Sequence, residues 1–254
     1  MHPILLQFGP FTLYSYGAFC ALGMLLGTLL IAWQLKWRVG TYDFLPSWIL
    51  VLVLAGFLGA RALNAFYHPQ LFWASPLEFM LSSGGLVLYG GFFAGIVAFY
   101  VLAKRSPYSL VTLADAFAPG VLLGVAFGRL GCFLAGCCYG TPCSIKALAV
   151  HYPSPHATLG MAVHAVQLYE AFGLLLLILW MLPVSKQRVW KGFNISLFFF
   201  GYGVLRFFME MLRGDKLLID GQLSVSQWFS LLAVAIGLLL WMRSHREKNA
   251  YRLD

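Results

Sequence analysis

Three arginines lie within apolar, glycine-rich stretches of the chain, at Arg61, Arg129 and Arg206. A lipid bilayer tolerates a guanidinium group only where the group has a partner or faces a water-filled cavity, so an ionisable residue at that depth indicates a functional site. Arginine can bind phosphate through two parallel hydrogen bonds. The three residues together therefore predict a site for an anionic ligand, and a phosphate-bearing ligand suits them best.

A polar stripe surrounds Arg206. Tyr202, Arg206, Glu210 and Arg213 follow one another at spacings of four, four and three residues, so they share one face of a helix. In a membrane this face must point to the interior of a helix bundle. The stripe fits a ligand site, and it also fits an ion pair between Arg206 and Glu210 that joins helices. The two roles are compatible.

Glycines surround Arg129 in the segment 128–140. Glycine allows a backbone to approach another helix or a ligand closely. Arg129 could instead reach from the end of a span to the outer interface, as long basic side chains do. Because that role needs no glycines nearby, the segment favours a site.

Two tyrosines stand beside glycines. Tyr89 lies between the glycine pairs at 84–85 and 90–91, and Tyr16 lies at the expected outer mouth of the first apolar run. The Tyr89 hydroxyl could donate a hydrogen bond to a phosphate or carbonyl oxygen. An ordinary interfacial aromatic residue is the alternative.

Four cysteines fall within twelve residues, at Cys132, Cys137, Cys138 and Cys143. A disulfide from Cys132 or Cys137 to Cys143 is one reading, since an outer location would be oxidising. The others are a metal site completed by His151 or His156, and simple structural thiols. The spacing lacks a CxxC pair and so argues against a metal.

Composition predicts an all-α polytopic membrane protein. The 254 residues are 61% hydrophobic and only 10% charged, with a mean hydropathy of +0.80, whereas a soluble domain has about 25% charged residues. The first 30 residues lack the basic start and cleavage site of a signal peptide. Spanning segments of about 20 residues are expected at 13–35, 47–67, 85–103, 112–135, 165–182, 193–212 and 222–242.

The distribution of basic residues predicts the orientation. With the N-terminus outside and the C-terminus inside, seven spans place 11 Lys and Arg residues in cytoplasmic segments and 3 in outer ones. The net charge of +8 is then explained by loop residues that face anionic lipid, without any nucleic acid. We expect a single integral membrane domain over 1–254, with a short outer loop at about 136–163. No internal repeat is evident, which weakens a transporter interpretation.

Five blocks, in the same order along nearly the whole chain, resemble the signatures of bacterial prolipoprotein diacylglyceryl transferases. The blocks are Tyr16-Gly17; Gly-Gly-Leu-Val-Leu-Tyr-Gly-Gly at 84–91; Gly-Arg-x-Gly-x-Phe-x-x-Gly-x-x-x-Gly at 128–140; Gln167-Leu168-Tyr169-Glu170; and Gly201-Tyr202-Gly203 with Arg206, Glu210 and Arg213-Gly214-Asp215.

The resemblance implies a multi-pass enzyme of the bacterial inner membrane that needs no cofactor. It would move the diacylglyceryl group of phosphatidylglycerol to the lipobox cysteine thiol of a preprolipoprotein, form a thioether and release glycerol phosphate. The implied catalytic residues are Arg129 and Arg206 on the phosphate, Glu210 orienting an arginine, and Tyr89. The implied substrate-binding residues are Tyr16, Gly90, Gly91, Arg129, Gln167, Tyr202, Arg206 and Arg213.

The chain departs from the commonest form of the family at three positions. Tyr89 stands where histidine is usual, and Cys132 and Cys137 replace the usual asparagine and glutamate. The general base and the acceptor therefore stay open. The alternatives are a related transferase with the same lipid donor and another acceptor, an anion or lipid transporter with an intramembrane arginine site, and a cysteine-based redox protein.

Overall fold

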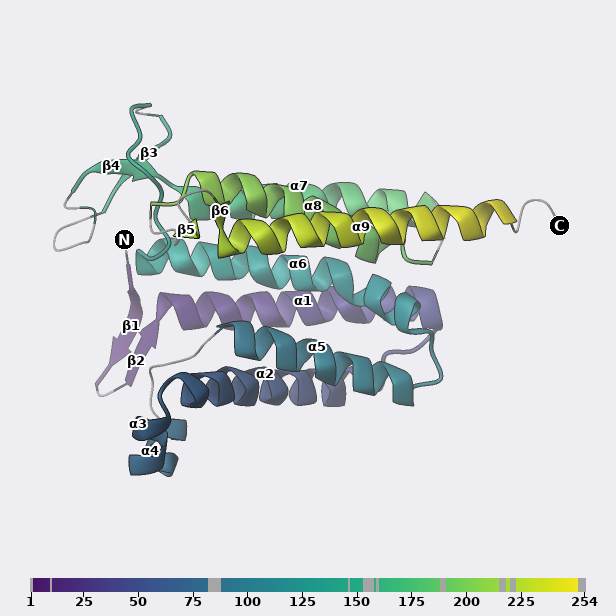
Figure 1. Ribbon diagram of the computed structural model, residues 1–254, viewed down its shortest axis with the longest axis horizontal. Coiled ribbons are helices and arrows are strands. Elements are labelled where there is room, and N and C mark those ends of the chain that lie inside the picture. The colour runs from purple at the N-terminus through teal and green to yellow at the C-terminus, as the bar shows by residue number, and fades with distance from the viewer. Residues whose placement is uncertain are drawn as a thin grey trace. The chain divides into compact units, whose positions relative to one another are not determined.

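The computed structural model describes residues 2–9, 11–81, 88–145, 147–152, 158, 160–187, 191–214, 218–219 and 223–250. Within them the chain is mainly helical, with three short antiparallel hairpins (Figure 1). The helices are α1 Ser15–Val39, α2 Leu45–Tyr67, α3 Pro69–Ala74, α4 Pro76–Leu81, α5 Leu88–Arg105, α6 Leu110–Ala135, α7 Val166–Gln187, α8 Phe193–Met211 and α9 Val225–Ala250. The strands are β1 Ile4–Phe8, β2 Phe11–Tyr14, β3 Ala149–His151, β4 Ala162–His164, β5 Leu218–Ile219 and β6 Leu223–Ser224.

A polytopic helical membrane protein was predicted, and the helices agree with it. Five of them, α1, α2, α6, α7 and α9, are long and apolar enough to cross a bilayer. The other two expected segments also form helices, α5 and α8. Polar residues such as Arg206 and Glu210 lower the hydropathy of α8.

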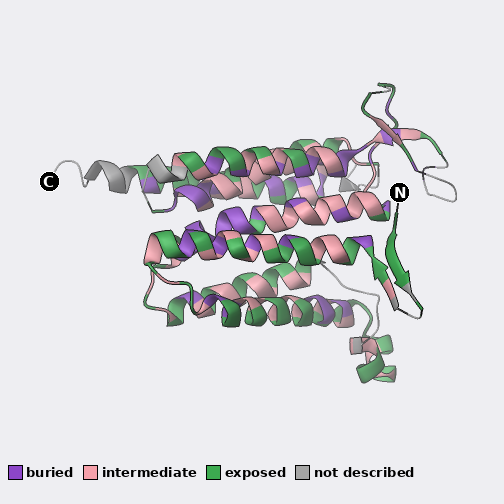
Figure 2. Ribbon diagram, turned by 180° about the vertical axis from the view of Figure 1, so that it is seen from behind, coloured by how far each residue is buried: buried purple, intermediate pink, exposed green. Residues whose placement is uncertain are grey.

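Large apolar side chains cover the outside of the helices. In Figure 2, exposed residues lie along the helical ribbons; many of these residues are large and apolar, as expected where lipid rather than water surrounds the helices. Among the most exposed are Leu25, Leu29, Leu50, Leu54, Val97, Leu179, Leu232 and Leu239.

The chain forms two compact units. The first unit comprises residues 1–34 and 114–254, and the second comprises residues 35–113. Both are built from apolar helices, and the expectation of one integral membrane domain stays a prediction.

In the first unit, α1 and α6 approach each other through glycines. A Cβ added at Gly27 would lie 2.6 Å from the Gly120 carbonyl oxygen, and one added at Gly23 would lie 2.6 Å from Phe127 Cβ. Gly23 and Gly27 form a GxxxG pattern, as do Gly120 and Gly124, and this spacing lets helix backbones pack closely in membranes. Residues of α6 and α7 form a buried apolar core that consists of Leu122, Ala126, Leu174, Ile178 and Met181.

A buried carboxylate on α6 caps the start of α8. Asp115 is fully buried and accepts hydrogen bonds from Gly192 N at 2.7 Å and Ile195 N at 2.9 Å. Asn194 Nδ2 donates to the Asp115 carbonyl oxygen at 3.1 Å. Free N–H groups and a partial positive charge are found at every helix N-terminus, so this contact fixes α8 on α6 and with it the residues that α8 carries.

The predicted outer loop at 136–163 contains the strand β3, which pairs with β4. The register joins Ala149 to His164 and His151 to Ala162. Isolated bridges join Gly140 to Arg213 and Pro142 to Val163. The loop is thereby attached to the segment that follows α8. In Figure 1, hairpins β1–β2 and β3–β4 and strands β5 and β6 lie at the same end of the first unit.

In the second unit, α2 and α5 pack through paired glycines. A Cβ added at Gly59 would lie 2.5 Å from the Gly90 carbonyl oxygen. A Cβ added at Gly91 would lie 2.8 Å from the Gly56 carbonyl oxygen. Gly90 and Gly91 thus have a packing role against α2. Their predicted contact with a substrate stays a prediction, and the preceding glycine pair at 84–85 lies outside the described residues.

Candidate phosphate site

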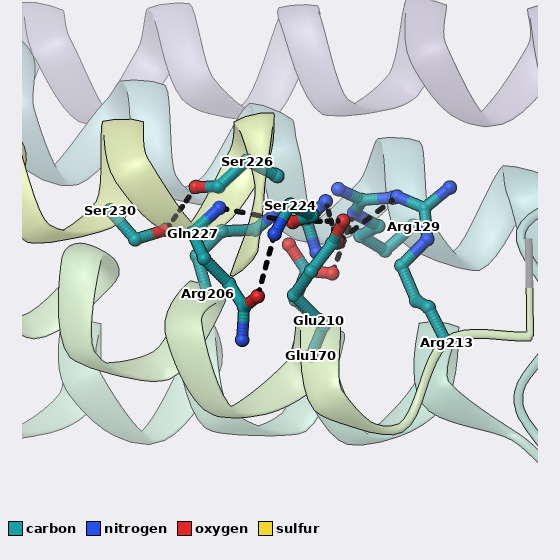
Figure 3. A network of polar contacts seen from close by, with 9 residues as sticks. All are labelled: Arg129, Glu170, Arg206, Glu210, Arg213, Ser224, Ser226, Gln227 and Ser230. Carbon is teal, nitrogen blue, oxygen red and sulfur yellow. Dashed lines mark hydrogen bonds and ion pairs between the residues drawn. The ribbon is translucent and has the colours of Figure 1, made fainter. Parts of the chain in front are cut away.

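Three arginines and two glutamates gather where α6, α7, α8 and α9 meet in the first unit (Figure 3). Arg129 Nε lies 3.0 Å from Glu170 Oε2. Glu210 Oε2 lies 2.6 Å from Arg206 Nη2 and 3.8 Å from Arg213 Nη1. All five side chains are at most 17% exposed. Three positive and two negative groups leave a net charge of +1, which suits an anion.

The start of α9 holds Glu210 from the other side. Ser224 Oγ donates to Glu210 Oε1 at 2.9 Å. Ser224 itself is fixed by a capping box, because Gln227 N donates to Ser224 Oγ at 3.2 Å and Ser224 N donates to Gln227 Oε1 at 2.9 Å. The same residues that begin α9 therefore position the carboxylate shared by Arg206 and Arg213.

The polar stripe predicted on α8 is confirmed as an ion-pair network, since Arg206, Glu210 and Arg213 contact one another. Tyr202, one turn earlier on α8, is in hydrogen-bonding contact with Arg129 of α6. Tyr202 also interacts electrostatically with Arg206, so it connects the Arg129–Glu170 pair with the group formed by Arg206, Glu210 and Arg213.

Glu170 is a site residue that the sequence interpretation quoted in a motif but gave no role. Its side chain is 1% exposed and pairs with Arg129 across the α6–α7 contact. The sequence feature that could have identified Glu170 is a carboxylate at the start of an apolar run. Such a group in a membrane needs a cation or a water-filled cavity beside it.

Several buried polar atoms of this cluster have no hydrogen-bond partner within the described part of the chain. They include Arg206 Nη1 and Glu170 Oε1. An unmet buried donor or acceptor costs about 1–3 kcal/mol, more if charged. The unmet guanidinium nitrogen of Arg206 can donate to an anionic ligand.

Gln167 has a positioning role at the edge of the cluster. Its Nε2 donates to the Cys137 carbonyl oxygen at 2.6 Å and to Tyr152 Oη at 2.9 Å. Tyr152, which the sequence interpretation missed, is fully buried, and its burial raises the pKa of its phenol. The contacts tie the loop after α6 to the first turn of α7. A direct contact of Gln167 with substrate stays a prediction.

Tyr16 approaches α6 close to Arg129. A Cβ added at Gly131 would lie 3.2 Å from the Tyr16 carbonyl oxygen. Because Gly131 has no side chain, the backbone of α1 at Tyr16 can approach α6 only two residues from Arg129.

Besides Gly90 and Gly91, two more of the predicted residues, Arg61 and Tyr89, belong to the second unit. Arg61 is buried, its Nη1 donates to the Phe79 carbonyl oxygen at 3.1 Å, and its guanidinium lies 5.4 Å from the centre of the Phe57 ring. Tyr89 is 44% exposed at the start of α5. The expected approach of Arg61 and Tyr89 to the other site residues stays a prediction.

Of the alternatives left open for the cysteines, the structure agrees with free thiols and not with a disulfide. All five are free thiols, so the structure forms no disulfide to Cys143. The sulfur atoms of Cys132, Cys137 and Cys138 instead lie within 4.8 Å of one another. Sulfur hydrogen bonds with Cys132 and Cys137 hold the pKa of the Cys138 thiol well below its ordinary value, helped by the charges of Arg213 and Arg129.

The chain is similar to a family of known proteins. The sequence model of the family described as prolipoprotein diacylglyceryl transferase matches residues 3–243. Proteins named phosphatidylglycerol–prolipoprotein diacylglyceryl transferase are similar along almost their full length. One from Clostridium tetani is 32% identical over 95% of this chain and 97% of its own, and one from Bordetella avium is 33% identical over 97% and 96%. A second such enzyme of Clostridium perfringens is 31% identical over 90% of both chains. The chain therefore belongs to the prolipoprotein diacylglyceryl transferase family.

Proposed function

We propose that this protein transfers the diacylglyceryl group of phosphatidylglycerol to the lipobox cysteine thiol of preprolipoproteins. One observation assigns this reaction to a particular site in the structure, namely the buried cluster of Arg129, Arg206 and Arg213. The five described side chains of this cluster, three arginines and two glutamates, sum to a net charge of +1, and Arg206 Nη1 has no hydrogen-bond partner among the described residues. A phosphodiester carries one negative charge, so its binding would neutralise the cluster.

The reaction follows from the two substrates. The acceptor thiolate attacks the glyceryl carbon that carries the phosphate, the C–S bond forms, and the C–O bond to phosphate breaks. The products are the thioether and glycerol phosphate, and the thiol proton leaves to a base or to the released phosphate. Negative charge grows on the leaving oxygen, where fixed guanidinium groups are most useful.

The carboxylates prevent the arginines from adopting other positions. Glu170 holds Arg129 through Nε, which leaves both terminal nitrogens of that guanidinium for other contacts. Glu210 holds Arg206 through Nη2, and Nη1 has no protein partner among the described residues. A guanidinium held in this way loses little freedom on binding phosphate.

We also propose the finer placement in the membrane: seven spans formed by α1, α2, α5, α6, α7, α8 and α9 in the bacterial inner membrane, with the N-terminus outside. In that orientation the site lies near the outer face, because α6 ends and α7 starts beside it. Preprolipoproteins emerging through the membrane would present their cysteine there.

The test is transfer of labelled diacylglycerol from phosphatidylglycerol to a lipobox peptide, with purified protein in phospholipid micelles. Arg206→Ala is expected to lower the rate about 10²–10³-fold, the usual cost of removing a transition-state donor. Arg206→Lys should also fail, since an ammonium group lacks the planar fork. The matched control is Arg105→Ala, at the exposed end of α5. A folded Arg206→Ala protein with full activity would refute the assignment.

A second acceptor is favoured by one specific observation, the tyrosine at position 89 where the commoner family form has histidine. The same assay, run with a small thiol in place of the peptide, distinguishes a preprolipoprotein acceptor from a small-thiol acceptor. Transfer to the small thiol and none to the peptide would identify a related enzyme with the same donor.

A further inference from the structure

Three cysteine sulfurs lie together just beyond the end of α6. Cys132 is in the last turn of α6, and Cys137 and Cys138 follow in the loop, with all three Sγ atoms within 4.8 Å of one another. The proposed transfer reaction uses none of these thiols. Cys143, the nearest other cysteine in sequence, is buried and donates its thiol to the Ile145 carbonyl oxygen at 3.5 Å.

Local helix chemistry brings the first two sulfurs together. Gly136 has φ 79° just after the helix end. Its N–H donates to the Phe133 carbonyl oxygen at 3.2 Å, and Cys137 N donates to that of Cys132 at 3.1 Å. These bonds define a Schellman motif, in which the residue after the glycine packs on the residue five positions earlier. Apolar side chains usually make that contact, and here both are cysteines.

The third sulfur is held at a cost. Cys138 has φ 62°, and no other non-glycine residue in the described ranges has a positive φ. A residue with a side chain adopts this left-handed conformation only at an energetic cost, because its Cβ comes too close to the following carbonyl oxygen. Such strain persists where the surroundings impose it and is concentrated at functional sites.

The distances suit a metal ion better than a disulfide. A disulfide would join two sulfurs and leave the third aside, whereas three sulfurs bound to one ion at about 2.3 Å would lie about 4 Å apart. The upper limit of the observed separations, 4.8 Å, exceeds this value by less than about 1 Å. No histidine or carboxylate of the described residues belongs to the group, so all its ligands are sulfur, which selects soft ions and excludes magnesium and calcium.

We propose that Cys132, Cys137 and Cys138 form a three-thiolate site for a soft d10 metal cation, Zn²⁺ or Cu⁺. Each thiol that binds the ion releases its proton to solvent. Three thiolates with one divalent cation sum to −1, and with one monovalent cation to −2. The guanidinium groups of Arg129 and Arg213 lie close enough to Cys138 to interact with it electrostatically, and they would offset that charge.

A metal bound by these cysteines would stabilise the positions of Arg129 and Glu170 in the phosphate site. Cys132 is three residues after Arg129 on α6. The Cys137 carbonyl oxygen accepts from Gln167, three residues before Glu170 on α7. The cluster and the Arg129–Glu170 pair therefore rest on the same two helix ends, and metal binding would stiffen the contact between them.

The experiment uses the full chain in detergent, reduced and freed of metal, and titrated separately with Zn²⁺, Cd²⁺ and Cu⁺ against chelators of known affinity. One ion per chain is expected, with thiolate-to-metal charge-transfer absorption for Cd²⁺ and three sulfur neighbours by X-ray absorption. Competition between Zn²⁺ and Cu⁺ identifies the preferred ion. Loss of a residue that only hydrogen-bonds to a metal ligand lowers metal affinity about 10–100-fold. A larger loss is expected for each of the variants that remove a ligand: Cys132→Ser, Cys137→Ser and Cys138→Ser. Cys143→Ser, outside the group, should bind as the wild type does.

A second measurement needs no variant. Bound metal should protect three of the five cysteines of the wild-type chain from maleimide, as read by mass spectrometry of peptides. The proposal is overturned if the reduced chain binds no ion, if Cys143→Ser loses the ion as well, or if no cysteine is protected. Metal binding without lipid transfer would contradict the proposed function alone, and lipid transfer without metal binding would contradict this site alone.

Discussion

Arg129 on α6 and Glu170 on α7 form a buried ion pair, with 3.0 Å between Nε and Oε2. The contact engages the side of the guanidinium and leaves its two terminal nitrogens for other partners. Tyr202 of α8 also contacts Arg129. Three helices thus converge on one arginine.

Glu170→Gln should lower transfer about 10–100-fold, because the uncharged amide cannot hold Arg129 by an ion pair while the side chain keeps its size. Breaking a buried pair can cost about 3–5 kcal/mol of stability, so the melting temperature should fall too. The measurement is kcat and KM for phosphatidylglycerol beside thermal unfolding in detergent. Glu78→Gln, on exposed α4, is the control. Unchanged kinetics in Glu170→Gln would show that Arg129 needs no carboxylate.

Tyr89→Phe should lower transfer about 10–100-fold with little change in the shape of the pH–rate profile. We expect the hydroxyl to bind the donor headgroup, since a phenol O–H can donate a hydrogen bond to a phosphate or carbonyl oxygen. The measurement is kcat/KM across pH for both proteins. A titrating limb present in the wild type and lost in Tyr89→Phe would instead identify Tyr89 as the general base.

No cysteine of the chain should become covalently modified by the lipid during turnover. The proposed reaction is direct attack by the acceptor thiol, so serine variants at 132, 137 and 138 should lower activity without abolishing it. Mass spectrometry of the intact protein after incubation with phosphatidylglycerol alone checks this. A diacylglyceryl adduct on any cysteine would require a two-step mechanism.

Asp115→Ala should destabilise the protein by about 1–3 kcal/mol, because Gly192 N and Ile195 N would lose their buried acceptor. The charge that favours the α8 N-terminus would be lost as well. Thermal unfolding should show the loss, and transfer by the folded fraction should be largely kept, since Asp115 belongs to no part of the proposed site. Asp43→Ala, in an exposed turn, should unfold like the wild type.

Gly27→Ala should destabilise the first unit, although alanine is favoured over glycine in helices by about 1 kcal/mol. The new Cβ would meet the Gly120 carbonyl oxygen at 2.6 Å, so α1 and α6 must separate. Gly95→Ala is the matched control, since nothing lies within 4 Å of its Cβ position. That variant should be neutral or slightly more stable. Equal melting temperatures for Gly27→Ala and the wild type would show that the two helices can shift freely.

Much of this protein could be predicted from local sequence. The apolar runs correspond to helices α1, α2 and α5 to α9, because hydropathy and length are properties of each segment alone. The network of Arg206, Glu210 and Arg213 was also predictable, because its members are three and four residues apart on one helix or just beyond its end. The family itself was identified from the motifs.

Other contacts were decided only by the tertiary structure. Asp115 caps α8 by accepting from Gly192, which lies 77 residues away, and Ser224 reaches Glu210 only because α9 starts beside the end of α8. The cysteine spacing left a disulfide to Cys143, a metal site and structural thiols open, and the Schellman turn at Gly136 brings Cys137 back onto Cys132. Periodicity shows which face of a helix is polar but does not show which other helix meets that face. In a membrane every helix is apolar outside, so the partner is chosen by close glycine packing and by the need of each buried charge for a counter-charge.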